Sequence, residues 1–249
     1  MATELPAVLV TRPSGQGDSL KGRLRQLGYR PLHQPMLELT ALEEVSPQQR
    51  QLLLDLDLYE HVIFISANAV RFGFSLIDDY WPQLPAGLGW YAIGGITAGL
   101  LAERGLDVIE PGAEMSSEGL LAVESLQDVA GARVLIVKGQ GGRDTLRREL
   151  DARGARVDEL ACYTRRCPVL PAGELGELLS REQIETVLIS SGEGLQNMLT
   201  LLSEEESTKF RDIRLVVPSP RVEKQAREAG FTQVKTAANA SDEAMLAAL

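Results

Sequence analysis

Small hydroxyl-bearing and cationic residues follow several short apolar runs of the chain, and these residues are the ones that could do chemistry. The runs lead into the segments TRPSGQG (11–17), SANAV (66–70), GGIT (94–97), KGQGG (138–142), SSGEG (190–194) and PSPR (218–221). Three of these segments carry a cation, namely Arg12, Lys138 and Arg221. Exposed helix N-termini together with Arg or Lys form natural sites for carboxylate or phosphate. The pattern therefore favours a polyanionic ligand.

Each segment taken alone has a simpler explanation. Ser, Thr and Gly after a strand are ordinary helix N-caps and tight-turn residues. The occurrence of six such junctions in one chain is what favours binding. The candidate binding residues are Arg12, Ser66, Asn68, Gly94, Thr97, Lys138, Ser190, Ser191, Gly192, Ser219 and Arg221.

Metal and nucleotide chemistry have little support in the sequence. The chain has two histidines, His33 and His61, and two cysteines, Cys162 and Cys167, whose spacing matches no common metal or redox motif. Neither G-x-x-x-x-G-K-[ST] nor G-x-G-x-x-G is present, so the GQGG at 139–142 is a weak nucleotide signal. We therefore expect no metal site, no Ser-His-Asp chemistry and no cofactor.

Length and composition are those of an ordinary globular protein. The 249 residues suit one large or two modest domains, and 44% of them are hydrophobic. The formal net charge of −10 argues against general nucleic-acid or anionic-membrane binding. The chain has no apolar stretch of about 18 residues and no signal-peptide pattern at its N-terminus. We expect a cytoplasmic monomer that acts on a small molecule.

The elements that position the candidate residues alternate between apolar runs and amphipathic stretches. Buried parallel strands are predicted for the apolar runs at 7–10, 62–65, 90–93, 133–137, 186–189 and 214–217. Helices are predicted for the amphipathic stretches at 19–28, 97–105, 144–154 and 222–230, each of which ends on a glycine suited to a helix C-cap. The alternation predicts an α/β fold.

An internal repeat relates the two halves of the chain. Arg12 and Lys138 are 126 residues apart, as are Gly28 and Gly154, while Ser66 precedes Ser190 by 124 residues. Nearly constant offsets indicate two similar α/β domains. Open parallel sheets place ligands at the carboxyl ends of their strands, which is where the candidate residues lie. The repeat alone suggests a tandem arrangement divided near residue 125.

Several motifs together resemble bacterial uroporphyrinogen-III synthase. They are LVTRP, FISANAV, YAIGGITAGLLAERG, VLIVKGQGGRDTLRREL, ACYTRR, LISSGEGLQNM and VVPSPRVEKQAREAGF, and they extend from Val8 to about Val234. The resemblance implies two flavodoxin-like parallel-sheet domains joined by two connector segments, near 34–39 and 162–166. One domain is expected to combine 1–36 with 167–249, and the other to comprise 37–166. Many relatives carry Arg in place of Lys138, and Lys lacks the bidentate geometry of Arg.

The resemblance also implies a reaction. It is the cyclisation of hydroxymethylbilane, a linear tetrapyrrole with eight carboxylates, to uroporphyrinogen III, with loss of water and inversion of the last pyrrole ring. Tyr163 of ACYTRR is the candidate catalytic residue, because the corresponding Tyr of the family faces the substrate cleft. With a pKa near 10 when unperturbed, a Tyr serves as a hydrogen-bond donor to the departing hydroxyl rather than as a strong acid. The alternative is a Tyr that merely packs at a domain junction.

Two functions of other classes share much of this pattern. A two-domain α/β binding protein could hold a polyanion without any chemistry, and a glycosyltransferase-like enzyme would have the same architecture. Turnover of hydroxymethylbilane would exclude the binding protein. Tight binding of a nucleotide sugar would identify the glycosyltransferase-like enzyme.

Overall fold

The computed structural model describes residues 5–112 and 114–249 of the chain. The chain divides into two compact units, of which unit 1 comprises 1–39 with 166–249 and unit 2 comprises 40–165. Strands occupy both crossings between the units, since β3 (Glu38–Ala41) covers the first and β8 (Arg156–Arg166) reaches the second. Each unit has a sheet of its own.

Unit 1 contains a sheet with the order β2-β1-β9-β10-β11, in which every neighbouring pair is parallel. Its strands are β1 (Ala7–Val10), β2 (Arg30–His33), β9 (Ile184–Leu188), β10 (Arg214–Val217) and β11 (Val234–Thr236). Its helices are α1 (Asp18–Gln26), α7 (Glu174–Arg181), α8 (Gly192–Leu201), α9 (Glu204–Lys209), α10 (Pro220–Glu228) and α11 (Asp242–Ala247). Numbered within the unit, the strand order is 2-1-3-4-5, the flavodoxin-like order.

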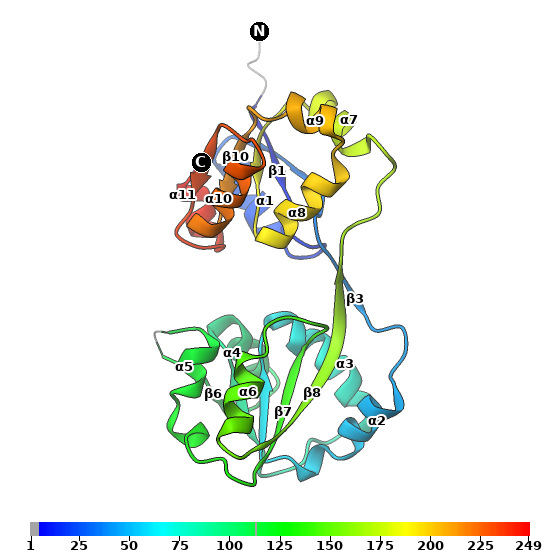
Figure 1. Ribbon diagram of the computed structural model, residues 1–249, viewed down its shortest axis with the longest axis vertical. Coiled ribbons are helices and arrows are strands. Elements are labelled where there is room, and N and C mark those ends of the chain that lie inside the picture. The colour runs from blue at the N-terminus through cyan, green and yellow to red at the C-terminus, as the bar shows by residue number, and fades with distance from the viewer. Residues whose placement is uncertain (1–4, 113) are drawn as a thin grey trace. The chain divides into compact units, whose positions relative to one another are not determined.

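Helices cover both faces of the unit 1 sheet (Figure 1). Successive side chains of a strand point to opposite faces. In β1, Val8 and Val10 pack with residues of α1 and α11, whereas Ala7 and Leu9 belong to a cluster with residues of α7, α8 and α10. The apolar run of β1 is therefore continuous because both of its faces are buried.

Unit 2 contains a sheet with the order β3-β8-β7-β4-β5-β6. Its other strands are β4 (His61–Phe64), β5 (Gly89–Ala92), β6 (Val108–Ile109) and β7 (Arg133–Gly139), and β8, β7, β4, β5 and β6 pair in parallel. Its helices are α2 (Pro47–Leu54), α3 (Ala67–Tyr80), α4 (Gly95–Ala102), α5 (Ser117–Leu121) and α6 (Thr145–Ala152), with short 3-10 turns η1 (Leu56–Leu58) and η2 (Glu124–Leu126). In β4, Ile63 packs with residues of α5 and α6, while Phe64 stacks on Phe74 of α3.

The two sheets have the same spatial order when β7 and β8 of unit 2 take the places of β1 and β2. Strands β4, β5 and β6 then take the places of β9, β10 and β11. The first residues of β1 and β7 are 126 positions apart, as are those of β2 and β8, so the sequence repeat is also a structural one. The tandem division near residue 125 is not observed, because β4 and β7 are neighbours in one sheet.

The predicted strands and helices are confirmed, and most of their ends lie within two residues of the predicted positions. All four glycines expected to end helices, namely Gly28, Gly105, Gly154 and Gly230, have left-handed backbones with φ between 79° and 96°. The apolar runs predict none of the strands β2, β3, β6, β8 and β11, because the residues of these strands are more polar or more exposed than those of the central strands.

Candidate functional site

In each unit the carboxyl ends of two adjacent central strands lie side by side. In unit 1 the chain leaves β1 toward α1 and leaves β9 toward α8, and these two helices pack on opposite faces of the sheet. In unit 2, β7 leads to α6 and β4 leads to α3 in the same way. Connections that diverge to opposite faces leave a crevice at the carboxyl ends, where ligands of doubly wound folds bind. The candidate residues follow these strands.

In unit 1, hydroxyls of the predicted site begin two helices. The Oγ of Ser191 accepts a hydrogen bond of 3.0 Å from the backbone N–H of Gly194 at the start of α8. The Oγ of Ser219 accepts one of 3.4 Å from the N–H of Val222 at the start of α10. Ser190 is half-buried and directly precedes the cap of α8. The ordinary capping role is therefore observed for Ser191 and Ser219.

Arg221 lies beside the N-terminus of α8. A Cβ atom added to Gly192, the first residue of α8, would lie 3.6 Å from both terminal nitrogens of the Arg221 guanidinium. Arg221 is exposed, and within residues 5–112 and 114–249 it forms neither an ion pair nor a hydrogen bond. A guanidinium and a helix N-terminus both attract anions. Among the predicted residues of unit 1, Gly192 and Arg221 therefore form the arrangement best suited to a carboxylate.

The guanidinium of Arg12 is paired with groups of its own unit. It forms an ion pair of 2.5 Å with Asp242 and donates a hydrogen bond of 2.6 Å to the carbonyl of Ala240. The side chain is 17% exposed. These contacts hold the first residue of α11 and the segment before it against the segment that follows β1. Contact between Arg12 and a substrate stays a prediction.

In unit 2, Tyr163 and Ser66 lie together. The Tyr163 hydroxyl is 3.3 Å from the Oγ of Ser66, which also accepts a hydrogen bond from the N–H of Ala69 and thereby caps α3. The Tyr163 ring is buried and stacks on Phe72 with a centroid separation of 5.2 Å. A Cβ added to Gly139 would lie 2.6 Å from the Cζ of Tyr163, so the absence of a side chain at Gly139 makes room for the ring.

The remaining predicted residues of unit 2 differ in accessibility. Asn68 is half-buried in the first turn of α3, whereas Gly94 and Thr97 are buried at the start of α4. Gly94 has no side chain to cap α4, so its position leaves the first N–H groups of this helix without an N-cap hydrogen bond among the residues that the structure describes. These groups are therefore donors that a ligand could use.

Lys138 is buried, and its ammonium is paired. Its Nζ donates a hydrogen bond of 2.9 Å to the Oε1 of Glu159 on the neighbouring strand β8. The side chain of Lys138 is 8% exposed and that of Glu159 is 25% exposed. Much of the charge that the sequence places at the end of β7 is therefore compensated inside unit 2.

Cationic residues missed by the sequence analysis line a cavity of about 310 Å³ in unit 2. Arg143, Arg147 and Arg165 line it together with Lys138, and Glu159 is its only acidic lining residue among those that the structure describes. Arg143 directly follows the two glycines that end KGQGG, and Arg147 is one helical turn further on. A signal existed in the sequence, namely the clustering of arginines around the start of α6.

The part of the chain that the structure describes contains no helix long and apolar enough to cross a membrane. Within those same residues, no group of three or more His, Cys, Asp or Glu residues could hold a metal ion.

The adjacent serines at the start of α8 provide a test of the capping role. Ser191→Ala is expected to lower the free energy of unfolding by about 1 kcal/mol, the usual cost of losing a cap. Ser190→Ala is the matched control and is expected to change it by less than about 0.5 kcal/mol, because Ser190 caps no helix. Urea unfolding measures both. Equal losses in the two variants would contradict the assignment of the cap to Ser191.

Comparisons with known proteins agree on one family. Residues 18–247 match the family described as uroporphyrinogen-III synthase HemD. The chain is 36% identical over 248 residues to the uroporphyrinogen-III synthase of Escherichia coli K12, which covers 98% of this chain and 99% of the relative. It is 33% identical to the enzyme of the same name from Proteus mirabilis, over 78% of this chain and 98% of the relative.

Solved structures share the fold. A mutant uroporphyrinogen III synthase from Thermus thermophilus has a TM-score of 0.60 at 20% identity, over 97% of this chain and 96% of that one. Uroporphyrinogen-III synthetase from Helicobacter pylori 26695 has a TM-score of 0.61 at 17% identity, over 98% and 97% of the two chains. At these identities the likeness concerns the fold, whereas the matches in sequence cover nearly the whole chain. The chain belongs to the uroporphyrinogen-III synthase family.

Proposed function

We propose that the chain cyclises hydroxymethylbilane to uroporphyrinogen III, with loss of water and inversion of ring D. Its enzymatic class is that of its family, a hydro-lyase of tetrapyrrole biosynthesis. The observation that carries the proposal is the 36% identity to a uroporphyrinogen-III synthase over 98% of the chain. The polar and cationic strand ends of both units support it, because the substrate carries eight carboxylates.

We propose that each unit contributes carboxylate ligands from the ends of its strands. In unit 1 the exposed Arg221 beside the N-terminus of α8 is the strongest candidate, with the backbone of Gly192 next to it. Ser190, two residues before Gly192 in the chain, is a further candidate. In unit 2 the candidates are Asn68 and the first N–H groups of α4. Backbone donors at helix N-termini suit carboxylates without requiring a cation for each one.

The reaction requires little acid strength from the protein. A hydroxymethylpyrrole is electron-rich, so its hydroxyl leaves readily as water once a proton is supplied, and an azafulvenium electrophile remains. The free end of the chain closes on this electrophile without help to give the uninverted type I isomer. The enzyme must therefore hold the flexible tetrapyrrole so that the substituted α-carbon of ring D, and not the free one, bonds to the azafulvenium carbon, which is catalysis by positioning. The bond between that ring D carbon and the methylene shared with ring C then breaks. The released methylene bonds to the free α-carbon of ring D, which loses its proton and completes the inversion.

Tyr163 is the proposed donor to the departing hydroxyl. Its phenol lies 3.3 Å from the Ser66 Oγ, at the end of β4 where a ligand of unit 2 would bind. Phe72 and Gly139 hold its ring on two sides, so the hydroxyl has a defined position. A hydrogen bond from Tyr163 to the hydroxyl would stabilise the charge that develops as water leaves.

We propose further that the chain acts as a cytoplasmic monomer without metal or cofactor, and that units 1 and 2 are its two domains. Loss of a hydroxyl from a hydroxymethylpyrrole is acid-assisted and involves no redox change, so the proposed residues supply the groups that the reaction needs. Treatment with a chelator is expected to leave the initial rate unchanged. A lasting loss of rate that one metal restores would contradict this.

The proposed activity predicts the isomer formed. With hydroxymethylbilane generated in situ by a deaminase, the protein is expected to give mainly uroporphyrinogen III, detected as uroporphyrin III after oxidation and chromatography. The same mixture without the protein gives the type I isomer. If the type I isomer predominates in the presence of folded protein, the proposed function is wrong.

A further inference from the structure

We propose that the cavity at the carboxyl end of the unit 2 sheet is a subsite for one carboxylate-bearing pyrrole ring of the substrate, with Arg143 and Arg147 as carboxylate ligands. The inference rests on the proposed function for the identity of the ligand. The choice of Arg143 and Arg147 comes from the residues that line the cavity, all of which lie within unit 2.

The inner wall of the cavity is apolar. Ile65 directly follows β4 and Ile93 directly follows β5, and Ile136 of β7 and Leu146 of α6 complete this wall. Ile136 and Leu146 are also members of the hydrophobic core between the sheet and helices α5 and α6. The wall is therefore held in place by the core of unit 2. An aromatic ring gains contact area on such a surface, whereas a small inorganic anion does not.

The rim of the cavity has an excess of positive charge. Glu159 is shared between two cations, because its Oε1 is 2.9 Å from the Nζ of Lys138 and its Oε2 is 3.5 Å from a terminal nitrogen of Arg147. Arg147 also lies 3.6 Å from Asp151, outside the cavity lining. Arg165 adds a further cation to the lining. Since Glu159 is shared by Lys138 and Arg147, it does not compensate Arg143, and an acidic group of a ligand would find an unshared cation there.

Arg143 is the cation best placed to receive a ligand. It is exposed, and the structure, over the residues it describes, gives it no ion pair and no hydrogen bond. The chain reaches Arg143 through Gly141 and Gly142, whose φ angles of 73° and 90° are left-handed and favour glycine. A Cβ on Gly142 would also lie 3.5 Å from a terminal nitrogen of Arg165. The two glycines therefore give the loop the turn that brings Arg143 to the cavity.

The combination of an apolar wall and a cationic rim identifies the class of ligand. A pyrrole ring with acetate and propionate substituents has a flat apolar face and two flexible carboxylates at its edge. The isoleucines suit the face, and planar guanidinium groups bind carboxylates in a bidentate manner. Arginines at the rim can therefore bind the carboxylates of such a ring, whereas Lys138 is buried and paired with Glu159.

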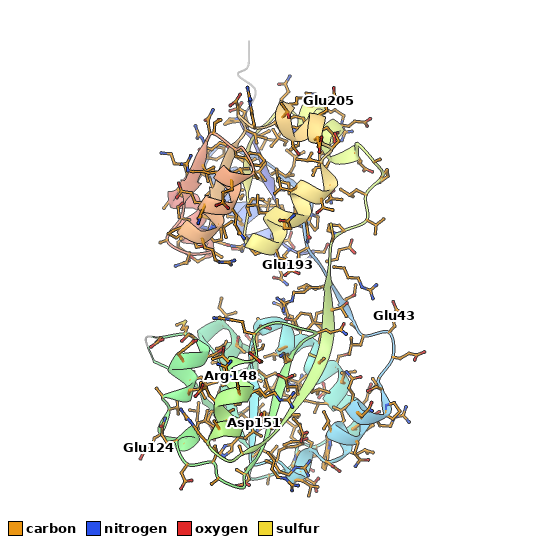
Figure 2. The ribbon with its side chains drawn as sticks, in the orientation of Figure 1. Glu43, Glu124, Arg148, Asp151, Glu193 and Glu205 are labelled. Atoms are coloured by element: carbon orange, nitrogen blue, oxygen red, sulfur yellow. The ribbon has the colours of Figure 1, made fainter. Side chains whose placement is uncertain are left out.

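The test compares arginines on either side of the start of α6. Arg143→Gln is expected to raise the KM for hydroxymethylbilane about tenfold, since a hydrogen bond to a charged group is worth at least about 1.4 kcal/mol, while turnover changes little. Arg143→Lys keeps the charge and is expected to fall between wild type and Arg143→Gln. The matched control is Arg148→Gln on α6 (Figure 2), which removes the same charge outside the cavity lining and is expected to change KM less than about twofold.

Binding of product-like porphyrins separates this inference from the proposed function. Arg143→Gln is expected to weaken binding of uroporphyrin III, which carries eight carboxylates, more than that of coproporphyrin III, which carries four. If wild type forms the type III isomer but Arg143→Gln binds uroporphyrin III and hydroxymethylbilane as wild type does, the subsite is refuted and the proposed function stands. If wild type forms no type III isomer, the proposed function fails. Equal effects of Arg143→Gln and Arg148→Gln would also refute the subsite.

Discussion

Tyr163→Phe is expected to lower the turnover number for hydroxymethylbilane by about 10- to 100-fold, with a change in KM below about threefold. The variant keeps the ring that stacks on Phe72 and loses only the hydroxyl near Ser66. The expected loss lies at or below the low end of general acid catalysis, because the leaving hydroxyl departs readily. Residual activity should still give the type III isomer, since positioning of the substrate does not depend on this hydroxyl.

Gly139→Ala provides a second probe of the same group. The added methyl would overlap the Tyr163 ring, since its Cβ would lie 2.6 Å from Cζ and 3.0 Å from the hydroxyl oxygen. Stacking on Phe72 and pairing of Gly139 with Tyr163 in the sheet restrict any movement of the ring. We expect a loss of turnover similar to that of Tyr163→Phe, and a loss of about 1–3 kcal/mol in stability from overpacking.

The control for both variants is Tyr80→Phe, which removes a phenol at the opposite end of α3 from Ser66. Steady-state kinetics at several concentrations of hydroxymethylbilane separate turnover from KM. If Tyr163→Phe keeps wild-type turnover, Tyr163 is a packing residue at the strand end and the proposed donor must be another group.

Lys138→Met is expected to destabilise unit 2 by about 2–3 kcal/mol. Breaking a buried ion pair by removing one partner is costly because the other charge is left behind. The cost here falls below the usual 3–5 kcal/mol because Glu159 is 25% exposed and retains Arg147 at 3.5 Å. Tryptophan fluorescence during urea unfolding reports on this unit, since Trp81 and Trp90 both lie within it.

The double variant Lys138→Met/Glu159→Gln distinguishes the loss of the pair from the loss of packing. Removing both charges is expected to restore at least half of the lost stability, because no carboxylate remains uncompensated. Arg148→Met serves as a control for the removal of a cation in the same unit, since Arg148 is exposed on α6. A single variant as stable as wild type would show that the ion pair of Lys138 contributes nothing to the fold, and would return Lys138 to the candidates for substrate binding.

Strands buried on both faces were predictable from local sequence, whereas strands at or near the sheet edges were not. The run AVLV becomes β1 because each of its side chains is buried. The segment RPLH becomes β2 although it is half-buried and contains a proline, because its backbone pairs with β1. The segment RVDELACYTRR is likewise not recognised as strand β8, because its ends are charged. Its pairing partner β7 begins 23 residues earlier. Strand propensity depends on such neighbours, which a local pattern does not contain.

The α/β class, the internal repeat and the place of the candidate residues after strands could be predicted from the amino-acid sequence, because side-chain periodicity, glycine and capping residues act over a few positions. The sequence also carried the family resemblance. Which charged side chains are available to a ligand depends on the folded structure. It pairs Arg12 with Asp242 and Lys138 with Glu159, and it leaves Arg143 at the rim of a cavity. Arg12 and Asp242 are 230 positions apart in the chain. Compensation of a charge depends on which groups lie within a few ångströms in space, and the folding of each sheet determines those neighbours.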